Sequence, residues 1–281
     1  DVILNGQDAN DVFGISVASA GDFNGDGKDD VIVGAYQDDN NSENNSGSAF
    51  IFFGGITGTK RADTDADVIL NGQDGAVSFP DRFGVAVASA GDFNGDGKDD
   101  VIVGADYDDN AGSIRGSAFI FFGGITGTKR ADADADVIIN AGDNYRLGSA
   151  VASAGDFNGD GKDDVIIGGF NADSVAGKVW IFFGGITGTK DADSDADVII
   201  TGQSGGDKFG GSVSSAGDFN GDGKSDVIVS AVGDDGNATD SGRAFIFFGG
   251  ITGTKSADAD ADVILNGQSA TDDFRFVASA G

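Results

Sequence analysis

The chain repeats one pattern four times at nearly regular intervals, and this repetition restricts the fold more than any other feature. The phrase DVILNGQ begins at Asp1 and Asp67, changes to DVIINAG at Asp136 and DVIITGQ at Asp197, and returns at Asp262, so successive starts are 66, 69, 61 and 65 residues apart. Within each period the order is the same: an F-G pair or a variant of it, VASAG or a close variant, an acidic loop, a VIVGA-like phrase, a polar loop, an apolar phrase ending in FFGGITGTK and an Asp-Ala run. This periodicity indicates a repeat protein whose units pack on their neighbours.

The apolar phrases within each period are short and rich in β-branched and aromatic residues. Gly, Asn and Asp interrupt them every few residues, which is typical of short strands joined by turns. Phrases such as Val31–Val33 and Phe50–Phe53 are apolar at consecutive positions, so both faces of their sheet need cover. We therefore predict an all-β fold, a β-propeller of four-stranded antiparallel blades. VASAG is expected to form the innermost strand, followed by VIVGA, AFIFFGG and the outer strand DVILNGQ.

The whole chain, 1–281, is expected to form a single propeller. Its repeats fall at approximately 1–66, 67–135, 136–196 and 197–261, with a partial repeat at 262–281. The chain opens on an outer strand and closes on an inner one, which gives four complete blades plus partial strands at both ends. Either the sequence is a piece of a longer array, or its two ends complete a partial fifth blade. Blades at the two ends would otherwise expose apolar faces, and self-association is one way of covering them.

Charge and composition exclude several classes of function. The 281 residues carry 47 acidic and 17 basic side chains, a formal net charge of −30, so the chain is not expected to bind nucleic acid or an anionic membrane surface. It contains neither Cys nor His, which removes disulfides, thiolate chemistry and imidazole metal ligands. No apolar run approaches the roughly 18 residues that cross a bilayer, so membrane insertion is not expected.

The acidic loop is the strongest candidate for a functional site. It reads GDFNGDGKDD at 21–30, 91–100 and 155–164, and GDFNGDGKSD at 217–226. If its first Asp is position one, oxygen-bearing side chains follow at positions three, five and nine, Gly stands at six, and the Lys at seven can offer its backbone carbonyl. Such a set of hard oxygens suits Ca²⁺ better than Mg²⁺ or a transition metal. The predicted ligands, one Ca²⁺ for each loop and about four in all, are Asp22, Asn24, Asp26, Lys28 and Asp30; Asp92, Asn94, Asp96, Lys98 and Asp100; Asp156, Asn158, Asp160, Lys162 and Asp164; and Asp218, Asn220, Asp222, Lys224 and Asp226.

Two other interpretations of the loop are weaker. An EF-hand begins in the same way but requires a Glu at position twelve, where this chain has Val33, Val103, Ile167 and Val229, and its flanks would be helical. Asp, Asn and Gly also make good turns without any ion. However, all four copies keep every ligand position, and three carboxylates in nine residues repel one another unless a cation neutralises them. We therefore favour a cation-binding β-hairpin.

The order F-G, VASAGDFNGDGKDD, VIVGA resembles the FG-GAP repeat of integrin α-subunit propellers and their bacterial relatives. The resemblance covers nearly all of the chain. It implies a β-propeller with Ca²⁺ in the loop between strands one and two of each blade, usually in an extracellular or cell-surface adhesion protein, with the ligands at the positions given above. The Pro of the GAP element is absent, since Tyr36 and Asp106 follow Gly-Ala, and Phe274-Arg275 stands where the terminal F-G belongs.

The leading interpretation is therefore a non-enzymatic, calcium-binding propeller of an extracellular adhesion or cell-surface protein. Its loop faces would bind a protein or glycan partner. One alternative is a polysaccharide-binding propeller or a polysaccharide lyase, for which Tyr145-Arg146 is the sole hint in the sequence. Another is a self-assembling surface-layer module. Trp180, which replaces Phe in the third strand of its blade, is expected to lie in the core.

Two further groups of aspartates remain open in the sequence. The Asp-Ala runs, such as Asp63, Asp65 and Asp67, are expected to place carboxylates on one side of an extended strand. There they would either hold extra cations or act as solvated charges that keep an outer edge strand from pairing. The loops after the second strands carry Asp38-Asp39, Asp108-Asp109 and Asp234-Asp235 and vary between repeats, which fits either partner contacts or simple loop variation.

Overall fold

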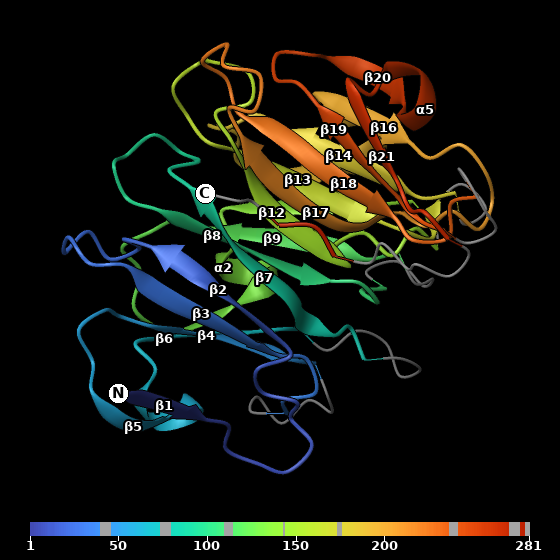
Figure 1. Ribbon diagram of the computed structural model, residues 1–281. Helices are drawn as coiled ribbons and strands as arrows, with labels where there is room; N and C mark the ends of the chain where they lie inside the picture. The colour runs from blue at the N-terminus through green and yellow to red at the C-terminus, as the bar shows by residue number, and fades with distance from the viewer. Residues whose placement is uncertain are drawn as a thin grey trace.

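The computed structural model describes residues 1–39, 46–73, 80–109, 115–142, 144–172, 176–235, 241–269 and 276–278. Four antiparallel blades fan out in chain order, as Figure 1 shows from blue to red. The innermost strands are β2 (Ser16–Gly21), β7 (Phe83–Gly91), β12 (Ala150–Gly155) and β17 (Phe209–Gly217). The second strands are β3 (Asp30–Ala35), β8 (Asp100–Ala105), β13 (Asp164–Gly169) and β18 (Asp226–Ala231).

The outer halves of the blades follow the same order. The third strands are β4 (Ser48–Phe52), β9 (Ser117–Phe121), β14 (Lys178–Phe182) and β19 (Arg243–Phe247). The fourth strands are β6 (Val68–Asn71), β11 (Val137–Asn140), β16 (Val198–Thr201) and β21 (Val263–Asn266). Each phrase thus forms the strand that the repeat pattern predicts, and the all-β propeller of four-stranded antiparallel blades is confirmed. The register places Val33 opposite Val17 on one side and Phe50 on the other.

The first three blades also receive a fifth strand, which the sequence analysis did not predict. It comes from the GTK segment of the following repeat and runs parallel to the outer strand: β10 to β6, β15 to β11 and β20 to β16. The same segment of the first repeat pairs with the short strand at the start of the chain, β1 (Val2–Asn5). These segments are β5 (Gly58–Arg61), β10 (Gly127–Arg130), β15 (Gly188–Asp191) and β20 (Gly253–Ser256). The GTK segment that follows the third strand of a blade therefore closes the outer edge of the blade before it.

The Asp-Ala runs are not extended strands, so that expectation is wrong. Each forms one short helical turn: α1 (Ala62–Asp65), α2 (Ala131–Asp134), α4 (Ala192–Asp195) and α5 (Ala257–Asp260). Two of the three aspartates in the first run bind backbone N–H groups: Asp65 accepts from Arg61 N and Asp67 accepts from Phe53 N, both at 2.8 Å. These carboxylates fix the turn between two strands, and the outer strands of the first three blades are not free edges.

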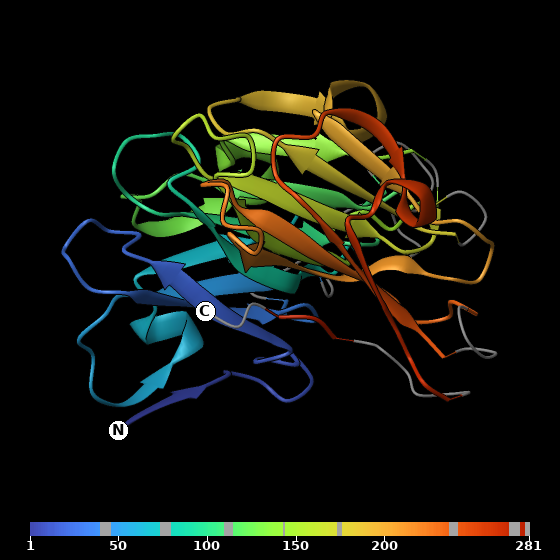
Figure 2. The ribbon, with the colours of Figure 1, turned by 45° about the horizontal axis from the view of Figure 1, so that its top comes forward.

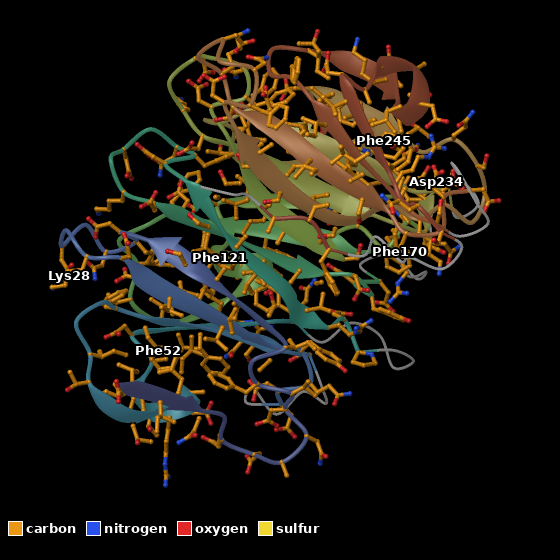
Figure 3. All side chains as sticks on the ribbon, viewed as in Figure 1. Lys28, Phe52, Phe121, Phe170, Asp234 and Phe245 are labelled. Atoms are coloured by element: carbon orange, nitrogen blue, oxygen red, sulfur yellow. The ribbon has the colours of Figure 1, made fainter. Side chains whose placement is uncertain are left out.

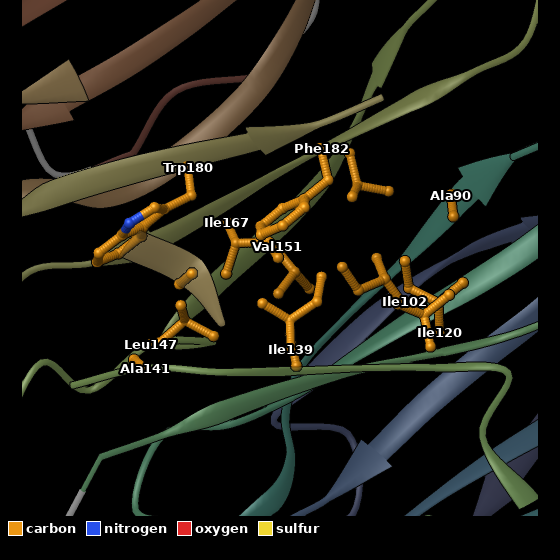
Figure 4. Close-up of a cluster of buried hydrophobic side chains, with 14 of the residues drawn as sticks. Ala90, Ile102, Ile120, Ile139, Ala141, Leu147, Val151, Ile167, Trp180 and Phe182 are labelled. Atoms are coloured by element: carbon orange, nitrogen blue, oxygen red, sulfur yellow. The ribbon is translucent and has the colours of Figure 1, made fainter. Parts of the chain in front are cut away.

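The hydrophobic core lies between neighbouring blades rather than within one. Figure 4 shows one such layer, where Ile102 and Ile120 of the second blade face Ile167, Trp180 and Phe182 of the third. All five side chains have no exposed surface. The expectation that Trp180 belongs to the core is therefore confirmed. Each inner blade is covered on both faces, and for this reason its strands carry apolar residues at consecutive positions.

The inner strands β2, β7, β12 and β17 lie side by side, and the two end blades each leave one face open (Figure 2). Val17 in the first blade is 65% exposed, whereas its counterpart Val87 in the second is 5% exposed. Phe219 in the last acidic loop is 59% exposed, whereas Phe157 in the preceding loop is fully buried. The last described residues follow the fourth blade, where Val277 N donates to Ser212 Oγ at 3.2 Å. Phe274-Arg275 lies outside the described residues.

Candidate metal centres

The four acidic loops connect the first and second strands at one end of every blade. Figure 3 labels Lys28 in the first loop, and Phe170 and Asp234 at the opposite end of the molecule. The loops turn sharply at position six, where Gly27 and its counterpart Gly97 have φ of +85° and +88°. An L-residue adopts such values only with strain, so the glycine is what permits the sharp turn at this position.

The aspartate at position one organises the loop backbone. In the first loop, Asp22 Oδ1 accepts a hydrogen bond from Asp26 N at 2.8 Å, and Asp22 Oδ2 accepts one from Gly27 N at 2.9 Å. The same pair of bonds occurs at the other three first positions, Asp92, Asp156 and Asp218. In the second, third and fourth loops Oδ1 also accepts from the glycine N–H at position four, whereas Oδ2 keeps a lone pair that these bonds leave available. The aspartate can therefore shape the loop and still bind a cation.

The aspartate at position nine ties the loop to the end of the third strand. Asp30 is 1% exposed, and its two oxygens accept from Gly54 N at 2.7 Å and from Asn24 N at 3.2 Å. The other three ninth positions, Asp100, Asp164 and Asp226, are fully buried and accept from the equivalent backbone groups. The carboxylate at position nine is thus held between the backbone of the loop and the end of the third strand.

The side chains at positions three and five complete the oxygen set. Asn24 Oδ1 and Asn94 Oδ1 are buried and have no hydrogen-bond partner among the described residues. In the third and fourth loops the same Asn oxygen accepts from the backbone N–H at position five, at 2.7 Å. A buried carbonyl oxygen without a partner is costly, and a bound cation would satisfy it. These oxygens, with the flanking carboxylates, fit Ca²⁺.

The structure brings the predicted ligands of each loop into one turn but does not bring every carboxylate to contact distance. Among the described residues, one group of three acidic side chains has oxygens that all lie within 4.8 Å of one another, and it is not in these loops. The loop carboxylates instead accept backbone N–H bonds. In the first loop, Asp26 Oδ2 also pairs with Lys28 Nζ at 2.9 Å, and this contact lowers the pKa of Asp26. Positions one, three, five and nine, with the carbonyl at seven, could hold one cation per loop.

Burial makes the ionised form of the aspartate at position nine unfavourable. It raises the pKa of Asp100 and of Asp164 to about 7, against the lowering effect of the backbone N–H bonds from Gly123 and Asn94 in the first case. The nearby carboxylates of Asp96 and Asp92 raise the pKa of Asp100 further. Burial likewise raises the pKa of Asp30. A divalent cation would remove this penalty, because it favours the ionised form.

Position eight has a role that the sequence analysis missed. Asp99 Oδ2 accepts from Asp22 N of the preceding loop at 2.7 Å, and Asp163 Oδ2 accepts from Asp92 N at 2.8 Å. The fourth loop has Ser225 here, whose backbone N–H donates to Asp156 O at 3.1 Å. This position therefore joins each loop to the one before it. The first Asp of GKDD, repeated in three of the four loops, was the signal, but spacing alone does not reveal a contact between blades.

The lysines at position seven also reach the neighbouring loop. A Cβ placed on Gly25 of the first loop would lie 3.3 Å from Lys98 Cε of the second, and one on Gly95 would lie 3.1 Å from Lys162 Cε of the third. The side chains thus lie over the glycines of the preceding loop. The positive charges of successive repeats lie between acidic loops, which offsets part of the repulsion along this end of the molecule.

Tyr145-Arg146, the residues that hinted at an enzyme, have structural contacts. Tyr145 stacks on Trp180 with ring centroids 5.9 Å apart, and Arg146 Nη2 pairs with the buried Asp106 at 2.7 Å. Arg146 also lies over the Tyr107 ring, 4.3 Å from its centroid. Arginines and aromatic rings alternate here across three blades: Tyr36, Arg82, Tyr107, Arg146 and Phe170. These residues pack the blades together at the end opposite the acidic loops.

Comparisons with known proteins agree with this architecture. The family model described as the FG-GAP repeat matches residues 13–52, 83–116, 147–182 and 209–247. Integrin alpha-PS3 of Drosophila melanogaster is 33% identical over 179 residues, which is 62% of this chain and 15% of that protein. Integrin alpha-5 of Xenopus laevis is 30% identical over 253 residues, 83% of this chain and 21% of that protein. Phosphatidylinositol-glycan-specific phospholipase D of Bos taurus is 33% identical over 155 residues, 53% of this chain and 18% of that protein.

The chain therefore spans no more than 21% of the length of these relatives. No helix among its described residues is long and apolar enough to cross a bilayer. The integrin relatives indicate a propeller of the cell-adhesion type, whereas the phospholipase D relative shows that the same repeats also occur in a protein named as an enzyme. Each of the four matched segments includes the F-G position and the whole acidic loop of its repeat, so the chain belongs to the FG-GAP repeat family.

Proposed function

We propose that residues 1–281 form one calcium-stabilised propeller unit of an extracellular, cell-surface adhesion protein. Its repeats have the boundaries predicted from the sequence, and its loop faces bind a protein or glycan partner. The similarity to integrin α-subunits supports the adhesion role. A non-catalytic function is part of this proposal, because Tyr145-Arg146, the pair that hinted at an enzyme, is engaged in packing.

The acidic loops are the Ca²⁺ sites in this proposal. Each ion is held by the side chains at positions one, three, five and nine and by the carbonyl of the Lys at position seven, as in Asp22, Asn24, Asp26, Asp30 and Lys28. The observation that carries this assignment is the buried, partner-free amide oxygen at Asn24 and Asn94 beside a buried carboxylate. At a free Ca²⁺ concentration of about 100 times Kd, each occupied site would add about 2.7 kcal/mol to the free energy of unfolding.

Calorimetric titration of the chelator-stripped chain with Ca²⁺ tests this proposal. We expect one equivalent for each loop and a large rise in Tm. Asp26→Asn, Asp96→Asn, Asp160→Asn and Asp222→Asn should each remove or weaken one equivalent, because each changes position five of a single loop. Asp65→Asn is a matched control, since this residue binds the Arg61 backbone N–H outside the loops. Equal Ca²⁺ stoichiometry in all five variants and the parent chain would refute the loop assignment.

The propeller could instead act on polysaccharide, and the same protein preparation tests this alternative. A glycan array measures binding, and a lyase assay on the bound glycans measures turnover. Binding without turnover supports a glycan-binding adhesion module. Turnover would overturn the non-catalytic proposal.

A further inference from the structure

Three of the four blades carry a second set of aspartates at the end opposite the acidic loops. Three positions contribute: the residue two before the F-G position, the loop after the second strand, and the second residue of the short helix. Their occupants are Asp11, Asp38 and Asp63 in the first blade; Asp81, Asp108 and Asp132 in the second; Tyr145, Ala172 and Asp193 in the third; and Asp207, Asp234 and Asp258 in the fourth. The repeat therefore brings carboxylates together here in three of its four copies.

The fourth blade neutralises its set with a cation from the chain. Arg243, the first residue of β19, pairs through Nε with Asp234 and through Nη1 with Asp258 Oδ1, the latter at 3.0 Å. In the third blade the same strand position is Lys178, whose Nζ lies 3.5 Å from Asp193 Oδ1. In these two blades, a positively charged side chain at the start of the third strand thus pairs with the carboxylates and offsets their negative charge.

The first blade keeps the carboxylates but has Ser48 at that strand position. Asp11 and Asp38 are 7% and 2% exposed, and their oxygens and those of Asp39 all lie within 4.8 Å of one another. Asp38 Oδ2 is buried and has no hydrogen-bond partner among the described residues. A small pocket lies against this cluster, and Asp11, Asp38 and Asp63 line it together with apolar side chains.

We propose that the cluster of Asp11, Asp38 and Asp39 binds a Ca²⁺ ion, which takes the role that the Arg243 guanidinium has in the fourth blade. Buried carboxylates this close together repel one another until a proton or a cation neutralises them, and Ser48 supplies no charge. All of these ligands are hard oxygens, and the Asp39 carboxylate is exposed to solvent, which suits Ca²⁺. The proposal is confined to the first blade, because among the described residues it is Asp11, Asp38 and Asp39 whose carboxylate oxygens all lie within 4.8 Å of one another. This site is separate from the acidic loops at the other end of the blade.

Two variants of the full chain test the site by different means. Asp38→Asn removes the buried charge, and Ser48→Arg installs the cation found in the fourth blade. Both should bind one Ca²⁺ equivalent fewer than the parent chain, measured by calorimetric titration of chelator-stripped protein and by equilibrium dialysis. Ser48→Arg should in addition keep or raise Tm in calcium-free buffer, because the guanidinium takes over the compensation.

Ser117→Arg is the matched control, because Ser117 begins β9 and bonds Asn140 Oδ1 just as Ser48 bonds Asn71 Oδ1. It should leave the Ca²⁺ stoichiometry unchanged. If Asp38→Asn and Ser48→Arg both bind as much Ca²⁺ as the parent, the site does not exist. Failure of the loop sites gives a different result: the parent would then bind a single equivalent, which Asp38→Asn abolishes and Asp26→Asn does not.

Discussion

The buried aspartate at position nine has two functions that a conservative substitution can separate. Asp100 accepts two backbone N–H bonds, from Gly123 at 2.8 Å and Asn94 at 3.0 Å, and is also a proposed Ca²⁺ ligand. Asp96, at position five of the same loop, is more accessible and accepts from Lys98 N. An asparagine can replace one acceptor oxygen of an aspartate, but its NH₂ group cannot replace the other.

Asp100→Asn is therefore expected to lower stability both with and without Ca²⁺. The substitution leaves one buried backbone N–H without an acceptor, which costs about 1–3 kcal/mol. Asp96→Asn should lower Tm only in Ca²⁺, because the remaining carbonyl oxygen still accepts the bond from Lys98 N. Thermal unfolding of both variants in calcium-free and calcium-containing buffer provides the comparison. Equal losses for Asp100→Asn and Asp96→Asn in calcium-free buffer would contradict a structural role for position nine.

The raised pKa values at position nine predict opposite pH responses with and without metal. The pKa of Asp100 and Asp164 is about 7 in the folded chain, against an ordinary value of 3.8. Between these values the folded state holds more protons than the unfolded state, so the free energy of unfolding falls as pH rises through this window. Chelator-stripped protein should therefore have a higher Tm at pH 5.5 than at pH 8. Ca²⁺ binds the ionised carboxylates, so the gain in Tm on adding Ca²⁺ should shrink as the pH falls.

Spacing within the loop was enough to predict which side chains occupy the turn. The loop is formed by consecutive residues, so the alternation of oxygen-bearing side chains and the glycine at position six depend on local sequence alone. The contacts of position eight were not predictable, since Asp99 and Asp163 bind the backbone of a different repeat. The same limit applies to Arg146, whose partner Asp106 lies forty positions away and in another blade. Long-range pairs of this kind depend on how blades stack, which local spacing does not encode.

At the scale of the element, the link between loops is the feature that a matched pair of variants can test. Asp163 joins the third loop to Asp92 N of the second, whereas Asp29 holds the same position in the first loop, which no described loop precedes. Asp163→Ser introduces the residue that the fourth loop has naturally. It should lower the free energy of unfolding by about 0.5–1.5 kcal/mol through loss of one hydrogen bond. Asp29→Ser should have almost no effect in the same denaturant titration.

The strands themselves were predictable because their apolar phrases are short, β-branched and separated by turn residues. The fifth strand was not, since GTKR at Gly127–Arg130 has no apolar pattern that would indicate its pairing with β6. The Asp-Ala runs were misassigned for a related reason. Alternating Asp and Ala fits an extended strand, but Asp65 and Asp67 bind backbone N–H groups and fix a helical turn. The hydrogen bonds from the backbone to these side chains thus determine the local conformation, and the alternating pattern does not.

At the scale of the whole molecule, the two open blade faces are of complementary kinds. At every blade interface within the chain, the face that carries Val87 or its equivalent packs on the preceding blade. In the first blade the inner part of this face is open, with Val17 65% and Val31 41% exposed, whereas Leu4 and Phe13 pack against Val33 and Phe50 on its outer part. The opposite face is open in the fourth blade, where Phe219 is 59% and Leu265 41% exposed. A second copy placed head to tail would bury the exposed apolar side chains of both faces at once.

We therefore expect this chain to self-associate in a concentration-dependent way, as measured by analytical ultracentrifugation in Ca²⁺. Val17→Asp blocks one open face and Phe219→Asp blocks the other, because each places a charge where apolar burial is needed. Each variant alone should be monomeric, since every contact needs one face of each kind. An equimolar mixture of the two should form dimers and nothing larger, because one intact face remains on each partner. Thr189→Asp, an exposed position on β15 of a middle repeat, should associate like the parent chain. A parent chain that stays monomeric at all concentrations, or an association that neither variant weakens, would show that the open faces do not pair with each other.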